Sequence, residues 1–432
     1  MNGVQRNITL SDNTNKFYKW EVLGLLWFAF FINQADRQIY NTLLGPISES
    51  LNLTTADAGL ISTLFSLVFA TLGPISGVLA DRYSKKWIVV GSIVLWSAAT
   101  IISGSCAGLI GFIVFRSIAT GAGEAFFAPA NYATIAEYHD NKTRARAMSI
   151  HQTSYYFGVI VSGALAGWIA DIWGWRSAFY VFGSIGVFFG LYMIWRLKDK
   201  QKGISELSTK IERPSFGETL KMLFKVKTAL CMTLSFASLI FVLQGYLTWS
   251  TMYLQEKFPN MSLAEAGFSA MFYTHVFAFV GVLVAGWLSD FLAQKKAPYR
   301  ILLQSLGLLL ASPFIVLMGM SSTMTMVYIG FAGFGFFRAF FDANTYSVLY
   351  DVIPQKYHAS SAGVMLSLGF SIGSFSPWIL GKLEPLLGLS KGLAILSIVW
   401  VIFSIVLFVT FKLFYASDRE RAIQANLNNQ NN

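Results

Sequence analysis

The chain has 432 residues, of which 55% are hydrophobic and only 12% are charged. Because a soluble domain carries about 25% charged residues, this composition excludes an ordinary soluble protein and indicates an integral membrane protein. The formal net charge of +10 would suggest a nucleic-acid partner in a soluble protein, but here the basic residues fall between apolar segments. We therefore expect a lipid bilayer around the chain and no nucleic acid.

Twelve apolar segments follow one another along the chain, each near the roughly 20 residues that a helix needs to cross the hydrocarbon core. They lie at about 18–44, 56–80, 87–107, 109–137, 147–171, 175–196, 228–254, 263–289, 300–320, 324–352, 358–382 and 390–415. The sequence therefore predicts an all-α membrane protein with twelve transmembrane helices.

A long polar linker, residues 197–227, divides the chain into two bundles of six helices at 18–196 and 228–415, with tails at 1–17 and 416–432. Lys and Arg gather in this linker and in the loops after the second, fourth and eighth segments, whereas the loops after the first, third and ninth have none. Basic loops stay on the cytoplasmic side of a membrane. We therefore expect a multi-pass protein of the inner (plasma) membrane with both termini cytoplasmic.

The two bundles repeat each other in sequence. GVLADRYSKK (77–86) follows the second segment and GWLSDFLAQKK (286–296) follows the eighth, while EAFFAPANYATIAE (124–137) aligns with RAFFDANTYSVLYD (338–351). Parallel six-helix repeats are how transporters of alternating access are built, with the substrate site at the interface between the repeats.

These motifs resemble those of the major facilitator superfamily. The loop motif GVLADRYSKK matches it with Ser84 where glycine is common, and the resemblance extends over roughly residues 18–415. Within the superfamily, ADR in the first segment, R…GEA in the fourth, TRARAMS and GWRSAFY are similar to two groups. One is the organic anion:cation symporters, which take up sugar acids and other carboxylates, and the other is the spinster-like lipid transporters.

Six charged residues lie well inside the predicted spans. They are Asp36, Arg37, Arg116, Glu124, Arg338 and Asp342. Left unpaired in the membrane they would cost roughly 15–20 kcal/mol, which exceeds the typical stability of a domain. We therefore expect them to face the bundle interior, to pair with one another, or to reach a water-filled cavity.

Asp36 and Arg37 are adjacent, so their side chains leave a helix about 100° apart and do not serve one spot. We expect Arg37 to face the cavity as an anion anchor and Asp36 to face a neighbouring helix. The resemblance implies a role for the pair in proton coupling and substrate binding. The alternative is a buried ion pair that fixes helix packing.

Arg116 and Glu124 lie eight residues apart, roughly 12 Å along one helix and about 80° around it. In the groups that the chain resembles, the spacing between this Arg and Glu is usually one residue shorter. Here RSIATGAGE has an extra residue before Gly121. Our hypothesis is that Glu124 and Asp36 carry the coupling proton, with sodium not excluded as coupling ion and with no cofactor or metal. The alternative is a Glu124 that stays ionised against an arginine.

Arg338 and Asp342 are four residues apart and so lie on one helix face. A plain intrahelical salt bridge explains them as well as a functional role does. Because Arg338 occupies the repeat position of Glu124, a cavity with Arg37 from one half and Arg338 from the other could clamp an anion.

Other polar and aromatic residues of the spans are candidates for substrate binding, although each also fits a role in packing. They are Gln34, Tyr40, Gln152, Tyr155, Trp249 and Asn344, with Gln244 as a further candidate that shapes specificity. SGALAGW (162–168) offers small residues for tight helix packing.

The loop motifs predict a gate at the cytoplasmic side. Its candidate residues are Gly77, Asp81, Arg82, Lys85, Lys86, Arg144, Gly286 and Asp290. The glycine Gly77 would allow close helix approach, Asp81 would cap a helix N-terminus across the half interface, and the basic residues would pair with acids at helix ends. The alternative for the lysines is a purely topogenic charge.

The sequence contains no motif of an ATP-driven pump or of a membrane enzyme. We therefore expect a monomeric secondary active transporter that imports a small organic anion with protons, a sugar acid such as a hexuronate or aldonate. The alternative within transport is a spinster-like carrier of a lipid or amphipathic solute, or an exporter. A receptor or enzyme is the remote alternative.

Overall fold

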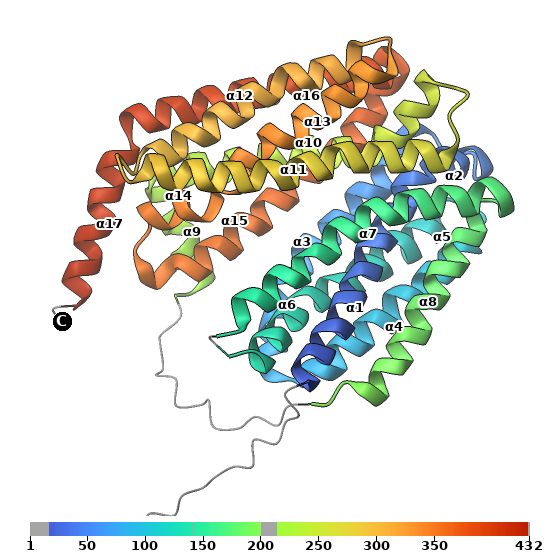
Figure 1. Cartoon of the computed structure of the whole chain (residues 1–432), viewed down its shortest axis with the longest axis horizontal. Coiled ribbons are helices and arrows are strands. Elements are labelled where there is room, and N and C mark those ends of the chain that lie inside the picture. The colour runs from blue at the N-terminus through green and yellow to red at the C-terminus, as the bar shows by residue number, and fades with distance from the viewer. Residues whose placement is uncertain (1–16, 141, 200–213, 431–432) are drawn as a thin grey trace, which may run out of the picture.

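The computed structural model describes residues 17–140, 142–199 and 214–430, and all of its regular structure within these ranges is helical. Two lobes hold the first and second halves of the chain (Figure 1). The first lobe, the N-half, contains α1 (Tyr18–Thr42), α2 (Leu44–Ser50), α3 (Thr55–Arg82), α4 (Lys85–Gly104), α5 (Leu109–Phe112), a π-helix (Ile113–Ala119), α6 (Thr120–Tyr138), α7 (Arg144–Trp173) and α8 (Trp175–Arg196).

The second lobe, the C-half, repeats this order. It contains α9 (Phe216–Lys225), α10 (Lys227–Lys257), α11 (Leu263–Ala293), α12 (Tyr299–Met320), α13 (Met324–Asp342), α14 (Thr345–Val352), a 3₁₀ turn (Gln355–Tyr357), α15 (His358–Gly373), α16 (Ser376–Leu413) and α17 (Tyr415–Gln430). Here α9 belongs to the linker and α17 to the C-terminal tail.

Twelve membrane crossings follow from these helices, as the sequence predicts. Ten helical stretches of the described residues are long and apolar enough to span a bilayer. The last of them, Gln355–Leu413, breaks into two spans at Gly388, whose φ of 72° no regular helix adopts. The remaining span is α1, whose 25 residues are about 37 Å long and whose charges lower its hydropathy.

A positive-φ glycine stands at the same place in both halves. Gly174, with φ 80°, separates the fifth and sixth spans as Gly388 separates the eleventh and twelfth. The two glycines are 214 residues apart, which is also the offset between Glu124 and Arg338. Because only glycine adopts this conformation readily, the repeat is a repeat of backbone geometry as well as of motifs.

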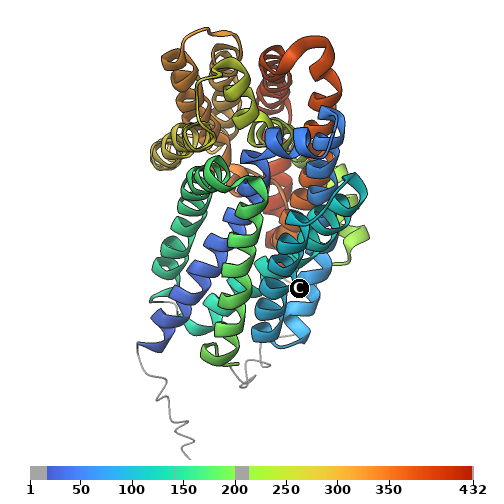
Figure 2. The same cartoon turned by 90° about the vertical axis from the view of Figure 1, so that its right-hand side faces the viewer.

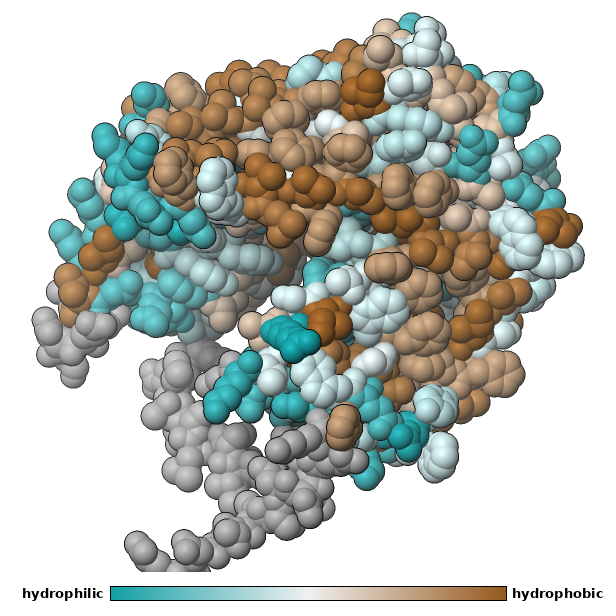
Figure 3. All heavy atoms as spheres, in the orientation of Figure 1, coloured by the Kyte–Doolittle hydropathy of each residue, from teal (hydrophilic) through white to brown (hydrophobic). Residues whose placement is uncertain are grey.

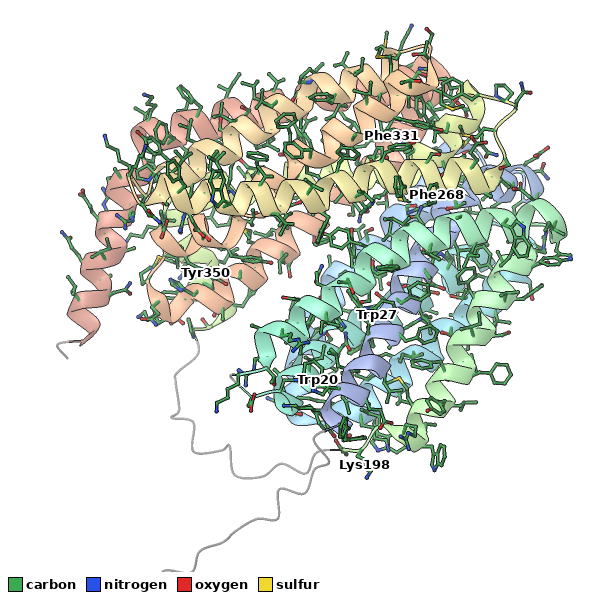
Figure 4. All side chains as sticks on the ribbon, in the orientation of Figure 1. Trp20, Trp27, Lys198, Phe268, Phe331 and Tyr350 are labelled. Carbon is green, nitrogen blue, oxygen red and sulfur yellow. The ribbon has the colours of Figure 1, made fainter. Side chains whose placement is uncertain are left out.

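The halves touch at one end of the molecule and part at the other (Figure 1), and Figure 2 looks onto the end where they touch. We call the end where α8 stops and α9 starts the linker face, and the opposite end, which holds α2, the distal face. In Figure 4, Trp20 and Lys198 mark the linker face of the N-half and Tyr350 that of the C-half. The space-filling view is hollowed between the lobes on the linker side, and apolar side chains cover the outer sides of both (Figure 3).

Glycines make the distal contact close. A Cβ at Gly59 of α3 would collide with the carbonyl of Pro377 in α16, and one at Gly163 of α7 would collide with Gly267 of α11. The small residues of 162–168 therefore pack tightly, as predicted. Asp171, at the end of α7, accepts a hydrogen bond from the backbone N–H of Ala264 (3.2 Å) at the start of α11.

Candidate binding site between the halves

A cavity of about 170 Å³ lies between the halves. The N-half lines it with α1, α3, the π-helix and α7, and the C-half with α10 and α15. On the distal side, Thr63 of α3 donates to the carbonyl of Ser374 (2.7 Å). On the linker side, the rings of Phe69 and Phe370 meet edge to face with centroids 6.1 Å apart. The cavity is therefore bounded at both ends by contacts between the halves.

Asp36 and Arg116 form a buried ion pair in the wall of this cavity. The guanidinium Nη1 of Arg116 lies 2.8 Å from Asp36 Oδ2, and both side chains are 4% exposed. The other carboxylate oxygen of Asp36 accepts from Thr100 of α4 (2.5 Å), and Arg116 Nη2 donates to the backbone carbonyl of Asp36 (3.1 Å). Asp36 thus faces its neighbouring helices, as expected, and the pair ties α1 to α4 and to the π-helix.

The π-helix explains the extra residue in RSIATGAGE. A π-helix arises where one residue is inserted into an α-helix and absorbs the insertion in a widened turn. It spans Ile113–Ala119 and contains Arg116, and the backbone N–H of Thr120 donates to the carbonyl of Phe115, five residues back, which also accepts from the Thr120 hydroxyl (2.9 Å). The regular-helix geometry that we assumed between Arg116 and Glu124 is therefore wrong, and the insertion was its signal in the sequence.

Arg37 and Glu124 form a second ion pair with a different character. Arg37 Nε donates to Glu124 Oε2 at 2.5 Å, and the Glu124 side chain is fully buried whereas that of Arg37 is 28% exposed. The guanidinium of Arg37 lies over the rings of Phe69 (4.4 Å) and Phe65 (5.5 Å) and lines the cavity, as predicted. The second oxygen of Glu124, Oε1, is buried and has no hydrogen-bond partner.

The C-half gives the cavity no charged group among the described residues that line it. Its lining residues are Ile240, Leu243, Gln244, Leu247, Thr248 and Phe370. Only Gln244 and Thr248 of this set are polar. Gln244 Nε2 donates to Ser66 Oγ of the N-half (3.1 Å), so its carboxamide joins the two halves at the cavity wall.

Arg338 does not line this cavity, which contradicts the predicted two-arginine clamp for this conformation. Its guanidinium lies 3.5 Å from Asp342, and its Nε is buried without a partner. Arg338 pairs along α13 of the C-half with Asp342 of the same helix instead of lining the cavity. The intrahelical salt bridge is the interpretation that fits Arg338 and Asp342 here.

Of the other predicted binding residues, Gln34, Tyr40 and Tyr155 line the cavity. The hydroxyl of Tyr40 is already used, because it donates to the carbonyl of Ala58 (2.7 Å). Gln152, Trp249 and Asn344 lie elsewhere and correct the prediction. Gln152 is exposed and outside the cavity lining, Trp249 is buried with its indole donating to the Pro377 carbonyl (3.1 Å), and Asn344 is buried against Ser289 inside the C-half.

The structure adds cavity residues that the sequence interpretation missed. They include Gln38, Asn41, Ser62, Phe65 and Ser66. A signal for the first two was available, because Gln34, Arg37, Gln38 and Asn41 stand at positions i, i+3, i+4 and i+7 of one helix face. The polar face of α1 was thus readable from the sequence once Arg37 was placed in the cavity.

The predicted gate residues lie at the linker face, where the halves are apart. Lys85 pairs with Glu137 (2.7 Å), and Asp290 with Arg300 (3.3 Å), each within its own half. Arg144 Nε donates to the carbonyl of His139 (3.2 Å), and Lys86 lies over the ring of Trp87 (5.2 Å).

Gly77 and its repeat counterpart Gly286 do not make the close helix approach that we predicted. In this conformation a Cβ at either position would touch nothing within 4 Å. Arg82 lies at the end of α3, and the side chain of Asp81 is outside the described part of the chain. Its capping role stays a prediction.

Two apolar grooves flank the site. One, of about 500 Å³, runs from Phe69 and Phe370 toward the linker face between α3, α6, α9 and α15. The other, of about 370 Å³, lies between α7 and α11 and is lined by His275 with four phenylalanines, Phe157, Phe268, Phe272 and Phe279. Figure 4 shows Phe268 on the α11 side of this second groove.

Curated proteins of similar sequence are named as membrane transporters. The chain is 27% identical over 372 residues to a probable L-galactonate transporter of Escherichia coli, covering 83% of this chain and 81% of that one. It is 24% identical to a probable galactarate/D-glucarate transporter of Bacillus subtilis, covering 87% of each.

Among solved structures, a bacterial homolog of the human lysosomal transporter spinster, in an inward-facing and occupied conformation, matches with a TM-score of 0.79. It is 20% identical and covers 93% of this chain and 98% of that one, so this likeness concerns the fold. Residues 26–377 match the sequence profile of the Major Facilitator Superfamily. With its two six-helix halves and the cavity between them, the chain is a member of the Major Facilitator Superfamily of membrane transporters.

Proposed function

We propose that the protein imports a small organic anion, a sugar acid, together with a proton by alternating access. The observation that carries this proposal is the pair of Arg37 and Glu124. The guanidinium of Arg37 lines the cavity, and its ion-pair partner is a buried carboxylate that keeps one oxygen unpaired. Such a pair can exchange the carboxylate for a substrate anion.

The lining of the cavity supports a hydroxyl-bearing carboxylate. The planar guanidinium of Arg37 matches the two oxygens of a carboxylate. Around it, amides and hydroxyls such as Gln34, Gln38, Asn41 and Ser62 offer the donors and acceptors that sugar hydroxyls require. The relatives named as galactonate and galactarate transporters support the same class of substrate.

Charge balance supports coupling to a proton at Glu124. Asp36, Arg37, Arg116 and Glu124 together carry no net charge, and all four belong to the N-half. A substrate anion on Arg37 would leave one uncompensated negative charge in a site screened from water, which is costly. A proton on Glu124 removes that charge and frees Arg37. Asp36 is less suited to carry it, because Thr100 and Arg116 already occupy both of its carboxylate oxygens.

The arrangement of the halves supports an inward-facing state in which Phe69 and Phe370 still close the cavity. By the distribution of Lys and Arg, the linker face is the cytoplasmic side of the inner membrane. The halves are sealed by glycine contacts on the distal side and separated on the linker side, with Phe69 and Phe370 between the cavity and the cytoplasmic groove. Return to the outward-open state then requires the distal contacts to break and the linker faces to meet.

Glu124→Gln in proteoliposomes tests this coupling. The amide keeps the shape of the side chain but holds no proton, so proton-driven accumulation of a sugar acid should be lost while exchange of labelled for unlabelled substrate continues. Asp342→Asn is the matched carboxylate-to-amide control in the C-half and should accumulate substrate normally. Accumulation by Glu124→Gln at the wild-type rate, or accumulation that follows a sodium gradient instead, would contradict the assignment.

A second candidate, transport of an amphipathic solute, has one observation in its favour. The phenylalanine-lined groove between α7 and α11 opens on the outer side of the lobes, where an alkyl chain could lie. Efflux or uptake of a single-chain amphiphile that Phe272→Arg blocks, with sugar-acid transport absent in the unmodified protein, would favour this function over the first.

A further inference from the structure

The charge of the cavity is confined to one of its two sides. Arg37 and Arg116 both come from the N-half, and the described C-half residues of the lining contribute only the carboxamide of Gln244 and the hydroxyl of Thr248 as polar groups. We propose that the site selects monocarboxylates over dicarboxylates, and that Gln244 determines this selection. The inference rests on the proposed function, because it names the subclass of sugar acid that the same site accepts.

One cation is available for a carboxylate. Arg116 is committed to Asp36 through Nη1 and to the backbone carbonyl of Asp36 through Nη2, and it is 4% exposed. Arg37 is the more exposed of the two and uses Nε for Glu124. A substrate carboxylate can therefore bind Arg37, whereas a second carboxylate at the far end of the same molecule would meet no cation among the described C-half residues that line the cavity.

One proton is available as well. Within the described lining and its ion pairs, Glu124 is the carboxylate with an unpartnered oxygen, and both oxygens of Asp36 are hydrogen-bonded. One proton balances one substrate charge, so that the four-residue cluster and its bound anion are together neutral. A dianion would bring a second negative charge into a cavity of about 170 Å³ without a proton to neutralise it. Burying an unpaired charge is strongly unfavourable.

Gln244 lies where it can form a hydrogen bond to the uncharged end of the substrate. It lies on α10, in the half opposite Arg37, and its Nε2 donates to Ser66 while lining the cavity. A carboxamide both donates and accepts, which suits a terminal CH₂OH group. A terminal carboxylate offers no donor to the carbonyl oxygen of the amide and adds a charge. A substrate held by Arg37 at one end and Gln244 at the other also contacts both halves, as alternating access requires.

L-galactonate and galactarate form a matched pair for the test, because they differ only in the oxidation of C6 from CH₂OH to carboxylate. Gluconate and glucarate form a second pair. The experiment uses proteoliposomes that hold the full-length protein and measures uptake of the labelled monocarboxylate of each pair. The unlabelled monocarboxylate and the unlabelled dicarboxylate of that pair are then compared as competitors. We expect the dicarboxylate to compete at least about tenfold less well than its partner, since a polar site rejects a mismatched group strongly. Equal competition within a pair would overturn the inference.

Gln244→Arg tests the residue. A cation opposite Arg37 should raise competition by galactarate relative to galactonate by about tenfold. Gln255→Arg is the matched control: the same change on the same face of α10, eleven residues toward the distal face and outside the cavity lining, should leave the ratio unchanged. An unchanged ratio in a Gln244→Arg protein that still transports, or an equal shift in both variants, would remove Gln244 from the assignment.

The two proposals fail in different ways. If neither member of either pair competes, the sugar-acid function is wrong and the selection falls with it. If the dicarboxylates are taken up as well as the monocarboxylates, the function stands and the selection is wrong. Uptake of one proton per galactonate, measured as alkalinisation outside the vesicles, would support the charge balance, and two protons per molecule would contradict it.

Discussion

The two halves share a fold and differ in where they keep their charges. In the N-half, two ion pairs share neighbouring residues of α1 and meet at the cavity. In the C-half, Arg338 and Asp342 lie one turn apart on a single helix and away from it. The same repeat therefore carries ion chemistry on one side and, on the other, an apolar wall with a few neutral polar groups. One half can hold the anion and proton while the other moves over them.

Breaking the buried pair of the N-half should have the largest effect. Asp36→Asn leaves the guanidinium of Arg116 buried without its counter-ion, and such a change costs about 3–5 kcal/mol. Asp342→Asn removes a longer contact of 3.5 Å to a carboxylate that is 32% exposed, so it should cost less than Asp36→Asn. Thermal unfolding of the purified variants would measure both. Equal loss of stability in the two variants would mean that the two ion pairs stabilise the fold to the same extent, which contradicts the expected difference between the halves.

The same comparison of the halves can be made by substrate affinity, with substitutions of Arg37 and Arg338. Arg37→Gln removes the cation that faces the cavity, and loss of a charged partner for a bound anion costs about 2–5 kcal/mol, so the affinity should fall by about 30-fold or more. Arg338→Gln should change the affinity by less than about threefold, because its side chain lies outside the cavity. Binding of a sugar acid to the detergent-solubilised variants would give both values. A larger effect at Arg338 would place the predicted clamp in another conformation of the transport cycle.

Much of this difference was readable in the sequence. Twelve spans, the repeat and the interior position of six charges follow from hydropathy and from the cost of a charge in lipid. The opposite directions of Asp36 and Arg37 follow from the 100° step between neighbouring residues of a helix. What these rules leave open is the partner of each charge, because a partner is chosen by contacts between helices far apart in the chain.

The failures have physical causes at particular residues. The spacing of Arg116 and Glu124 was interpreted with α-helical geometry, whereas a π-turn lies between them. Trp249 and Asn344 are polar groups in apolar spans, and composition does not distinguish a cavity face from a seam between helices, where both find backbone or hydroxyl partners. Gly77 and Gly286 were predicted to allow close helix packing at the linker face, where the two halves are apart in this conformation.

The smallest expected effect concerns pH at the linker face, where the halves again differ. His139 ends α6 and lies buried between the carbonyl of Lys19 (3.1 Å) and the hydroxyl of Thr143 (3.2 Å), and its repeat position in the C-half is Ile353. Burial lowers the pKa of His139 below its usual 6.5, an effect that hydrogen bonding to the Lys19 carbonyl opposes. The unfolded chain therefore binds the proton more tightly, so stability is retained above pH 6.5 and falls as the pH decreases through the lowered value. His139→Asn should remove this acid-dependent part of the thermal stability, while a His358→Asn control leaves it in place. A wild-type melting temperature with the same pH dependence as that of His139→Asn would show that this histidine does not link the N-half to protons on the linker side.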